Sequence, residues 1–345
     1  GQEIGRFLPT RNFRYGQFEH YESITSETMR KELSWKNTGC FGCGVIQCSK
    51  VSHWDGKEME GPEYETTAYL GSNCELKTAK DVAEANYLCD KYGLDTISTG
   101  VTTSFALECA ERGLLSEEDN ERLRFGDASS VFELIHEIAQ RRGPGNILAE
   151  GTRRAARAIG MESNYFAMNT GGMELSGVNP LGSYSMGLTL ATSDFASHTR
   201  FWSASDEMNG NLNFGMLPSY IIEGQDGTNA RNCLIVCDFL PYGFDRLVPF
   251  LNAATGFDCS ESDMLLLGER LQSLARDYAL KTGRTHDDDV MPPRFFEETS
   301  FAGLMEGKIP DRKFFEGQVQ EIFKLRGWDA EGKPTQETMA RLGLE

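Results

Sequence analysis

The sequence predicts a mainly α-helical chain of two domains, and three observations support this fold class. The chain has 345 residues, 39% apolar and 25% charged, which is ordinary for a globular protein and allows about two domains with substantial cores. Helix start and stop signals are frequent from residue 78 onward. From about Tyr165 the composition shifts to Gly, Ser, Thr and Asn, so we expect helical domains at 1–164 and 165–345.

The helices expected in the first domain have clear boundaries. Thr78 to Asp81 form a capping box, apolar residues then recur on one face, and Gly93 stands where a left-handed C-terminal residue belongs. Similar signals, each closed by a glycine, predict three further helices at 99–112, 130–143 and 146–159.

The second domain should open with loops. The stretch 169–182 is rich in Gly, Ser and Asn and is expected to form loops that approach a binding site. Helices are predicted again at 260–280 and 314–325. The polar stretch 285–294, with two consecutive prolines, cannot form a regular helix between them.

Charge and hydropathy exclude some classes of protein. The net charge of −18 argues against nucleic-acid binding, which needs clustered Lys and Arg to neutralise phosphates. No apolar stretch approaches the length of a membrane span. The first seven residues lack a signal-peptide core, and nine cysteines without a paired framework favour a reducing compartment. We therefore expect a cytoplasmic protein.

Three clustered cysteines indicate a metal centre. Cys40, Cys43 and Cys48 stand among glycines, which leave the backbone able to fold several thiolates around one centre. A structural zinc site normally needs a second pair of ligands, and no second CxxC or HxxxH motif is present. A [4Fe-4S] cluster with one remote cysteine suits the pattern better, and reduced cysteines buried in a turn are the alternative.

Other residues are candidates for binding or proton transfer. Asp90 and Asp95 flank a helix end at Gly93, where carboxylates can accept N–H hydrogen bonds from a pterin, although a simple helix cap with solvated acids would look the same. Glu65 and His198 are the preferred acid/base candidates, because a buried Glu or an ordinary His titrates near neutrality. A lone Glu or His is more often a surface or core residue.

These segments, taken in order, resemble a known family. They are Leu8–Phe13, the cysteine motif, Gly61–Thr66, Leu70–Asn73, Asp90–Asp95, Glu108–Leu115 and Gly327–Thr335. Together they resemble the aldehyde ferredoxin oxidoreductases, enzymes that carry tungsten on two pyranopterin dithiolenes beside a [4Fe-4S] cluster. The order of the segments makes a chance similarity improbable.

The resemblance implies a set of cluster ligands. It assigns Cys40, Cys43, Cys48 and the remote Cys237 to the [4Fe-4S] cluster and leaves Cys233 as a spare residue. Four residues separate Cys43 from Cys48, where the family typically has three, so the path of this loop differs from the family pattern.

The resemblance also implies two pterin-binding motifs. In the first, Asp90, Gly93, Leu94 and Asp95 match the family pattern. The second is degenerate, because Asn232 replaces the acid and Ile and Val replace Gly and Leu at positions 235 and 236. An asparagine still accepts an N–H bond but without charge assistance.

Near the metal, Glu65 and His198 resemble the residues that the family is thought to use for proton transfer. Cys74 is a further candidate, since a protein cysteine ligates tungsten in the related class II benzoyl-CoA reductases and a thiolate suits that soft metal. A buried structural thiol is the equal alternative for Cys74.

The largest departure from the family is a missing N-terminal β-rich domain, which a partner chain would supply unless the sequence is a fragment. We expect a tungsten or molybdenum bispyranopterin enzyme that interconverts aldehydes and carboxylates and passes electrons through the cluster to ferredoxin or an iron-sulfur subunit. An acidic ferredoxin would need a local basic patch for docking. The alternatives are a benzoyl-CoA reductase-type subunit, with Cys74 as metal ligand, and an iron-sulfur electron-transfer subunit without pterin.

Overall fold

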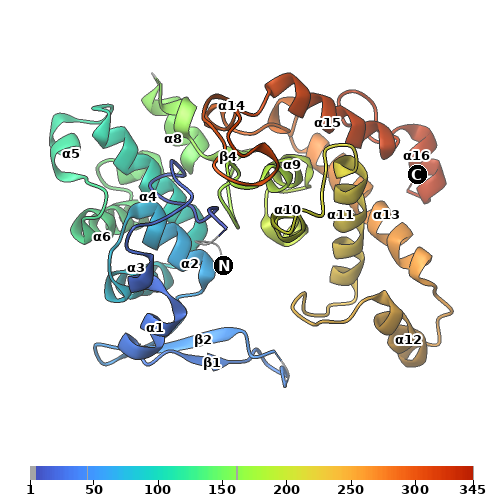
Figure 1. Ribbon diagram of the computed structural model, residues 1–345, viewed down its shortest axis with the longest axis horizontal. Coiled ribbons are helices and arrows are strands. Elements are labelled where there is room, and N and C mark those ends of the chain that lie inside the picture. The colour runs from blue at the N-terminus through green and yellow to red at the C-terminus, as the bar shows by residue number, and fades with distance from the viewer. Residues whose placement is uncertain (1–4, 45, 161, 345) are drawn as a thin grey trace. The chain divides into compact units, whose positions relative to one another are not determined.

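The computed structural model describes residues 5–44, 46–160 and 162–344 and is mainly helical, as the sequence predicts (Figure 1). Residues 1–4, in the N-terminal stretch considered for a signal peptide, and Val45, in the cysteine motif, lie outside the described residues. In the described part of the chain, no helix is both long and apolar enough to cross a membrane.

The chain divides into two compact units. The first runs to Tyr184 and also holds Met291–Pro310, and the second holds Ser185–Val290 and the chain from Asp311 onward. The first unit thus extends past the expected boundary at 164/165 and includes a segment from the second half of the chain. The domain limits expected from composition stay a prediction.

The first unit combines helices with two small sheets. Its helices are α1 (Ser26–Glu32), α2 (Tyr64–Thr66), α3 (Ala79–Tyr92), α4 (Thr96–Glu111), α5 (Glu117–Arg122), α6 (Ala128–Gln140), α7 (Gly145–Leu148), α8 (Thr152–Ile159) and α14 (Pro293–Glu297). Its strands are β1 (Lys36–Thr38), β2 (Ser49–Trp54), β3 (Lys57–Glu60), β4 (Asn169–Thr170) and β5 (Met173–Glu174).

The second unit is built from longer helices. They are α9 (Tyr184–Thr192), which begins at the end of the first unit, α10 (Ala204–Met208), α11 (Leu217–Cys233), α12 (Phe244–Thr255), α13 (Glu261–Lys281), α15 (Arg312–Leu325) and α16 (Gln336–Leu342). The stretch 285–294 holds a short 3-10 turn and the start of α14, so it is not one regular helix, as predicted.

Local capping fixes α3 and α4. The Thr78 hydroxyl accepts the Asp81 N–H at 3.1 Å, and α3 ends at Gly93, whose φ of 67° is left-handed, so both predicted ends are confirmed. The helix predicted at 99–112 begins earlier, because the Asp95 carboxylate accepts the Ser98 N–H at 2.7 Å.

The helix predicted at 146–159 is wrong, because α7 and α8 are separate. Gly151, with φ of 84°, turns the chain between them. The Thr152 N–H at the start of α8 donates to the Glu174 carboxylate at 2.7 Å. The predicted helix at 130–143 begins earlier than expected, at Ala128 after the Asp127 cap.

A three-stranded antiparallel sheet, in the order β1-β2-β3, was not predicted. Lys36 pairs with Val51 and Thr38 with Ser49, so the cysteine motif forms the connection between β1 and β2. Figure 1 shows β1 and β2 beside α1 at one edge of the first unit.

A buried ion pair holds the returning segment Met291–Pro310 in the first unit. Arg294 makes two hydrogen bonds to the Glu108 carboxylate, at 2.6 and 3.0 Å, and both side chains are fully buried. Burial raises the pKa of Glu108, but the hydrogen bonds and charge of Arg294 outweigh it and lower the pKa below its ordinary value.

Candidate active site

The segment Gly61–Thr66 leads into an unusual helix. After α2 the chain continues through a wide π-helical turn at Thr67–Gly71 and a 3-10 turn at Ser72–Cys74. Gly100 on α4 lies against the wide turn, since a Cβ there would come within 2.6 Å of the Tyr69 backbone. Wide turns of this kind often mark functional sites.

Glu65 lies where this segment meets the glycine-rich loop 169–182. The Gly177 N–H donates to the Glu65 Oε2 at 3.2 Å, and the Tyr64 hydroxyl donates to the Gly177 carbonyl at 2.7 Å. Burial raises the pKa of Glu65 to about 7, with a further rise from the Asp95 charge, against the opposing effect of the Gly177 hydrogen bond. Glu65 can therefore hold or release a proton near neutral pH.

The first pterin motif lies beside this segment. The Asn86 amide donates to the Asp90 carboxylate at 3.2 Å and to the Glu60 carbonyl at 2.8 Å, and the hydroxyls of Thr66 and Thr96 are 2.9 Å apart. Asp90 is exposed, and burial of its neighbourhood followed by the Glu60 charge raises its pKa. The structure thus brings Glu65 and the 90–95 turn together.

Tyr69, one turn after Glu65, is a residue that sequence analysis missed. Its side chain is fully buried, and its hydroxyl has no hydrogen-bond partner among the described residues. Burial, followed by the charges of Glu65 and Tyr64, raises its pKa well above the ordinary value. A buried hydroxyl without a partner costs free energy, so a polar group bound beside Glu65 would fit here. The only sign of Tyr69 in the sequence is its position, one helical turn after Glu65.

The cysteine loop carries three of the predicted cluster ligands. The Cys43 N–H donates to the Cys40 carbonyl at 2.9 Å, Gly42 has φ of 78°, and the Gln47 N–H lies 3.5 Å from the Cys43 Sγ. Backbone donors to sulfur are typical of iron-sulfur sites. In residues 5–44, 46–160 and 162–344, however, no three His, Cys, Asp or Glu side chains are grouped to hold a metal. The cluster ligands stay a prediction.

Hydrogen bonds join the cysteine loop to the Glu65 segment. The Lys50 N–H donates to the Glu63 carboxylate at 2.8 Å, and the Gly61 N–H donates to the Lys50 carbonyl at 2.9 Å. Because Cys48 lies only two residues before Lys50, the loop and the segment form one local structure within the first unit.

Cys74 has the contacts of a structural thiol. It is fully buried, and its Sγ lies 3.3 Å from the Tyr69 carbonyl and 3.5 Å from the Gly100 carbonyl. Burial raises its pKa far above the ordinary value, as is usual for a thiol in apolar surroundings. These contacts favour the structural alternative that the sequence left open.

His198 belongs to the second unit. It begins a short 3-10 turn, and its ring lies 6.0 Å from that of Trp202. Burial lowers its pKa to about 4, so the imidazole is neutral at pH 7. The Asp194–Arg200 ion pair, at 2.9 Å, braces the loop that carries it.

The degenerate second motif keeps one feature of the first. Asn232 lies in the last turn of α11, and Ile235 follows it with φ of 56°, close to the 67° of Gly93. Cys237 is exposed in the loop beyond, in the second unit. A left-handed turn therefore follows the helix in both motifs, although Ile is a poor residue for it.

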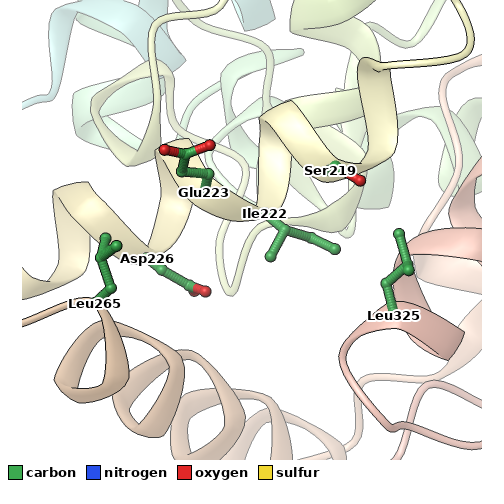
Figure 2. A pocket seen from close by; sticks show the side chains of 6 residues that line it. All are labelled: Ser219, Ile222, Glu223, Asp226, Leu265 and Leu325. Carbon is green, nitrogen blue, oxygen red and sulfur yellow. The ribbon is translucent and has the colours of Figure 1, made fainter. Parts of the chain in front are cut away.

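The second unit also holds an open hollow of about 330 Å³ between α11, α13 and α15. Ile222, Leu265 and Leu325 line it, and Asp226 points into it (Figure 2). The Asp226 carboxylate already accepts a hydrogen bond from Arg326 at 2.9 Å. No predicted site residue is among the described residues that line this hollow.

Comparison with known proteins identifies the family. A family model described as aldehyde ferredoxin oxidoreductase, domains 2 and 3, matches residues 3–344. The chain belongs to the aldehyde ferredoxin oxidoreductase family. This match confirms the family resemblance inferred from the sequence segments. It also confirms the mainly helical fold class that the sequence predicts.

Relatives within the aldehyde ferredoxin oxidoreductase family include tungsten proteins. A tungsten-containing aldehyde ferredoxin oxidoreductase of Pyrococcus horikoshii is 36% identical over 98% of the chain, and an aliphatic sulfonate oxidoreductase WOR-like subunit of Pyrococcus furiosus is 29% identical over the whole chain. The chain spans 57% and 56% of their respective lengths. A chain of the benzoyl coenzyme A reductase active-site complex BamBC, bound to 1,5-dienoyl-CoA, shares the fold, with a TM-score of 0.75 and 21% identity over 99% of this chain and 58% of that one.

Proposed function

We propose that the chain forms part of a tungsten or molybdenum oxidoreductase that interconverts aldehydes and carboxylates and sends electrons through a [4Fe-4S] cluster to ferredoxin. The observation that carries the proposal is the meeting of three segments at Glu65, whose pKa of about 7 suits proton transfer at neutral pH. Family membership supports the metal, and the substrate class is inferred from the tungsten relatives.

The residues of the chain fit the implied cofactors. Asp90, Gly93, Leu94, Asp95 and, in the second motif, Asn232 would bind the pterins. The cluster would be held by Cys40, Cys43, Cys48 and Cys237. When bound, the bispyranopterin metal supplies two-electron redox chemistry at a carbonyl carbon, and the cluster carries single electrons.

Glu65 and His198 would manage the protons. Oxidation of an aldehyde to a carboxylic acid consumes one water and releases two protons and two electrons. The Glu65 carboxylate accepts one of these protons at its Oε atoms, because a pKa near 7 leaves it partly ionised at neutral pH. Neutral His198 can donate a hydrogen bond from its ring N–H to the carbonyl oxygen.

A further domain would complete the enzyme. The chain corresponds to domains 2 and 3 of the family and spans little more than half of its relatives' length. We propose that a further domain, on a partner chain or on a longer form of this protein, covers the other side of the pterin site, and that the enzyme is cytoplasmic.

The benzoyl-CoA reductase-type alternative has weaker support. It required Cys74 as a metal ligand, and the contacts of the Cys74 thiol with two backbone carbonyls favour a structural role. The shared fold with the BamBC chain, at 21% identity, supports the architecture alone.

The alternative of an iron-sulfur subunit without pterin rests on the degenerate second motif. The left-handed turn at Ile235 argues against it, because the turn is kept even though the glycine is lost. Metal analysis of the anaerobically purified native enzyme separates the possibilities. Iron together with tungsten or molybdenum, and aldehyde-dependent dye reduction, are expected; iron alone would contradict both enzyme proposals.

A further inference from the structure

One surface of the first unit combines cationic and aromatic side chains next to the cysteine loop. The Arg30 guanidinium lies 5.5 Å from the centre of the Trp35 ring, and the Lys50 Nζ lies 5.1 Å from it. The Lys50 ammonium also donates to the Cys48 carbonyl, so this cationic cluster adjoins the last cysteine of the motif. We call the surface the carrier face and define it by Arg30, Trp35 and Lys50, together with Phe41 on the adjoining cysteine loop. Lys36 pairs with Val51 and therefore points to the other face of the sheet.

The carrier face is positive in a strongly negative protein. Residues 25–50 contain four basic and two acidic side chains, a net charge of +2, whereas the whole chain carries −18. The acids Glu58 and Glu60 lie on β3, the strand at the far side of β2 from Lys36. Arg30 and Lys50 meet at the Trp35 ring, and the Glu63 carboxylate lies beside Lys50 at its N–H.

Phe41 adds an apolar anchor to this face. It stands between Cys40 and Cys43 and is as exposed as a residue can be, at 110% of the reference area. Lysines on an edge strand such as β1 also discourage strand pairing, but that role explains neither the exposed Phe41 nor the pairing of Arg30 with Trp35. Exposed aromatic residues within a charged rim are typical of protein-binding surfaces.

We propose that the carrier face is the docking surface for an acidic iron-sulfur electron-carrier protein, an inference that rests on the function proposed above. Charge complementarity would steer the carrier to this face and away from the rest of the acidic surface. The carrier would then meet the cysteine loop directly, at the point where the chain holds its predicted cluster.

The first test measures association of an acidic [4Fe-4S] ferredoxin with the complete holoenzyme by stopped-flow anisotropy. The double variant Arg30→Glu with Lys50→Glu should slow association at least tenfold at low salt, and the effect should vanish near 1 M salt, where the Debye length is about 3 Å. If the Lys50 change releases iron, Arg30→Glu alone decides. The matched control is Arg154→Glu with Arg157→Glu on α8, which changes the net charge equally at the opposite edge of the first unit (Figure 1). Equal slowing by both pairs, or none by the first, overturns the proposal and leaves the face to a partner of another kind.

The second test concerns the apolar anchor. Phe41→Ser should raise the ferredoxin dissociation rate severalfold with iron content unchanged, whereas Phe257→Ser, at another exposed Phe, should not. If the Phe41 variant keeps its iron and its ferredoxin dissociation rate is unchanged, Phe41 is not an anchor. If the variant loses iron, the charge variants of the first test decide whether ferredoxin docks at this face.

Dye-linked activity separates this proposal from the proposed function. Wild-type enzyme that binds ferredoxin at this face but cannot oxidise aldehydes with a viologen dye would refute the function and keep the docking surface. Enzyme that is active with the dye, but whose ferredoxin binding is unaffected by the Arg30 and Lys50 changes, would refute the docking surface alone.

Discussion

Glu65 gives the most direct test at the scale of single residues. Replacing it with Gln removes a group whose pKa, raised mainly by burial to about 7, lies near the working pH. We expect kcat for aldehyde oxidation to fall by roughly 10²–10⁴-fold, with metal content retained and the rise of kcat through pH 7 abolished. Glu58→Gln, at an exposed acid on β3, is the control. Loss of tungsten from the Glu65 variant would instead make the residue structural.

The same residue predicts a pH dependence of stability. Because its folded-state pKa lies above the unfolded value, the folded protein binds the proton more tightly, so ionised Glu65 destabilises the fold as pH rises from about 4.5 through 7. Glu65→Gln should therefore be more stable than the wild type above pH 7, and the difference should close below about pH 4. Urea unfolding of the cofactor-free protein across this range measures it, and a constant difference would contradict the raised pKa.

Ile235 is strained in a way that can be measured. Its φ of 56° is unfavourable for a β-branched residue, and its side chain is 93% exposed, so little packing is lost on truncation. Ile235→Gly should stabilise the protein by about 0.5–1 kcal/mol, because relief of strain exceeds the entropy cost of glycine. Ile235→Ala keeps the Cβ and should gain less. Equal effects of Gly and Ala on the unfolding midpoint would rule out backbone strain as the cause.

At the scale of elements, Asp95 has two separable roles. It caps α4 through the Ser98 N–H, and it is a proposed pterin ligand. Asparagine caps as well as aspartate but lacks the charge, so Asp95→Asn should keep stability within a few tenths of a kcal/mol, whereas Asp95→Ala should lose about 1 kcal/mol. Both variants should lose bound pterin, measured after its release from the holoenzyme. Full pterin retention by Asp95→Asn would show that Asp95 is only a cap.

The same elements show what a sequence can predict. Thr78 and Gly93 delimit α3 because a cap acts within a few residues of its own helix end. The break before α8 was missed because the carboxylate at its N-terminus comes from Glu174, 22 residues away. The sheet was missed because β1 is only three residues long and its side chains are largely exposed, which leaves no alternating pattern.

The candidate site, too, could be predicted from the sequence only in part. Glu65 could be chosen from residue type and order in the chain, but its pKa depends on burial and on Asp95 and Gly177, which only the fold brings near it. Tyr69 could not be chosen, because an apolar helix with a tyrosine is ordinary until its hydroxyl is found buried without a partner.

At the scale of the whole molecule, Glu108 should carry far more stability than a comparable surface pair. Glu108→Gln leaves the fully buried Arg294 without its main counter-charge and should cost about 3–5 kcal/mol. The control is Glu306→Gln, which breaks the exposed Arg6–Glu306 pair on the same returning segment and should cost less than about 1 kcal/mol. Urea unfolding, with limited proteolysis of 291–310, checks both. Similar losses in the free energy of unfolding for the two variants would show that burial does not make the Glu108–Arg294 pair more stabilising than a surface pair.

That buried pair also has a consequence for biosynthesis. Arg294 follows Glu108 by 186 residues, a length that a ribosome takes roughly 10–40 s to translate at about 5–20 residues per second. In this interval Asn12, Arg14 and Arg112 are the partners that the described residues offer the Glu108 carboxylate. Residues 185–290 emerge meanwhile, so the second unit begins to form before the first is complete. Co-translational maturation of the first unit, and its need for chaperones, should thus be timed from the emergence of Pro310 rather than Tyr184.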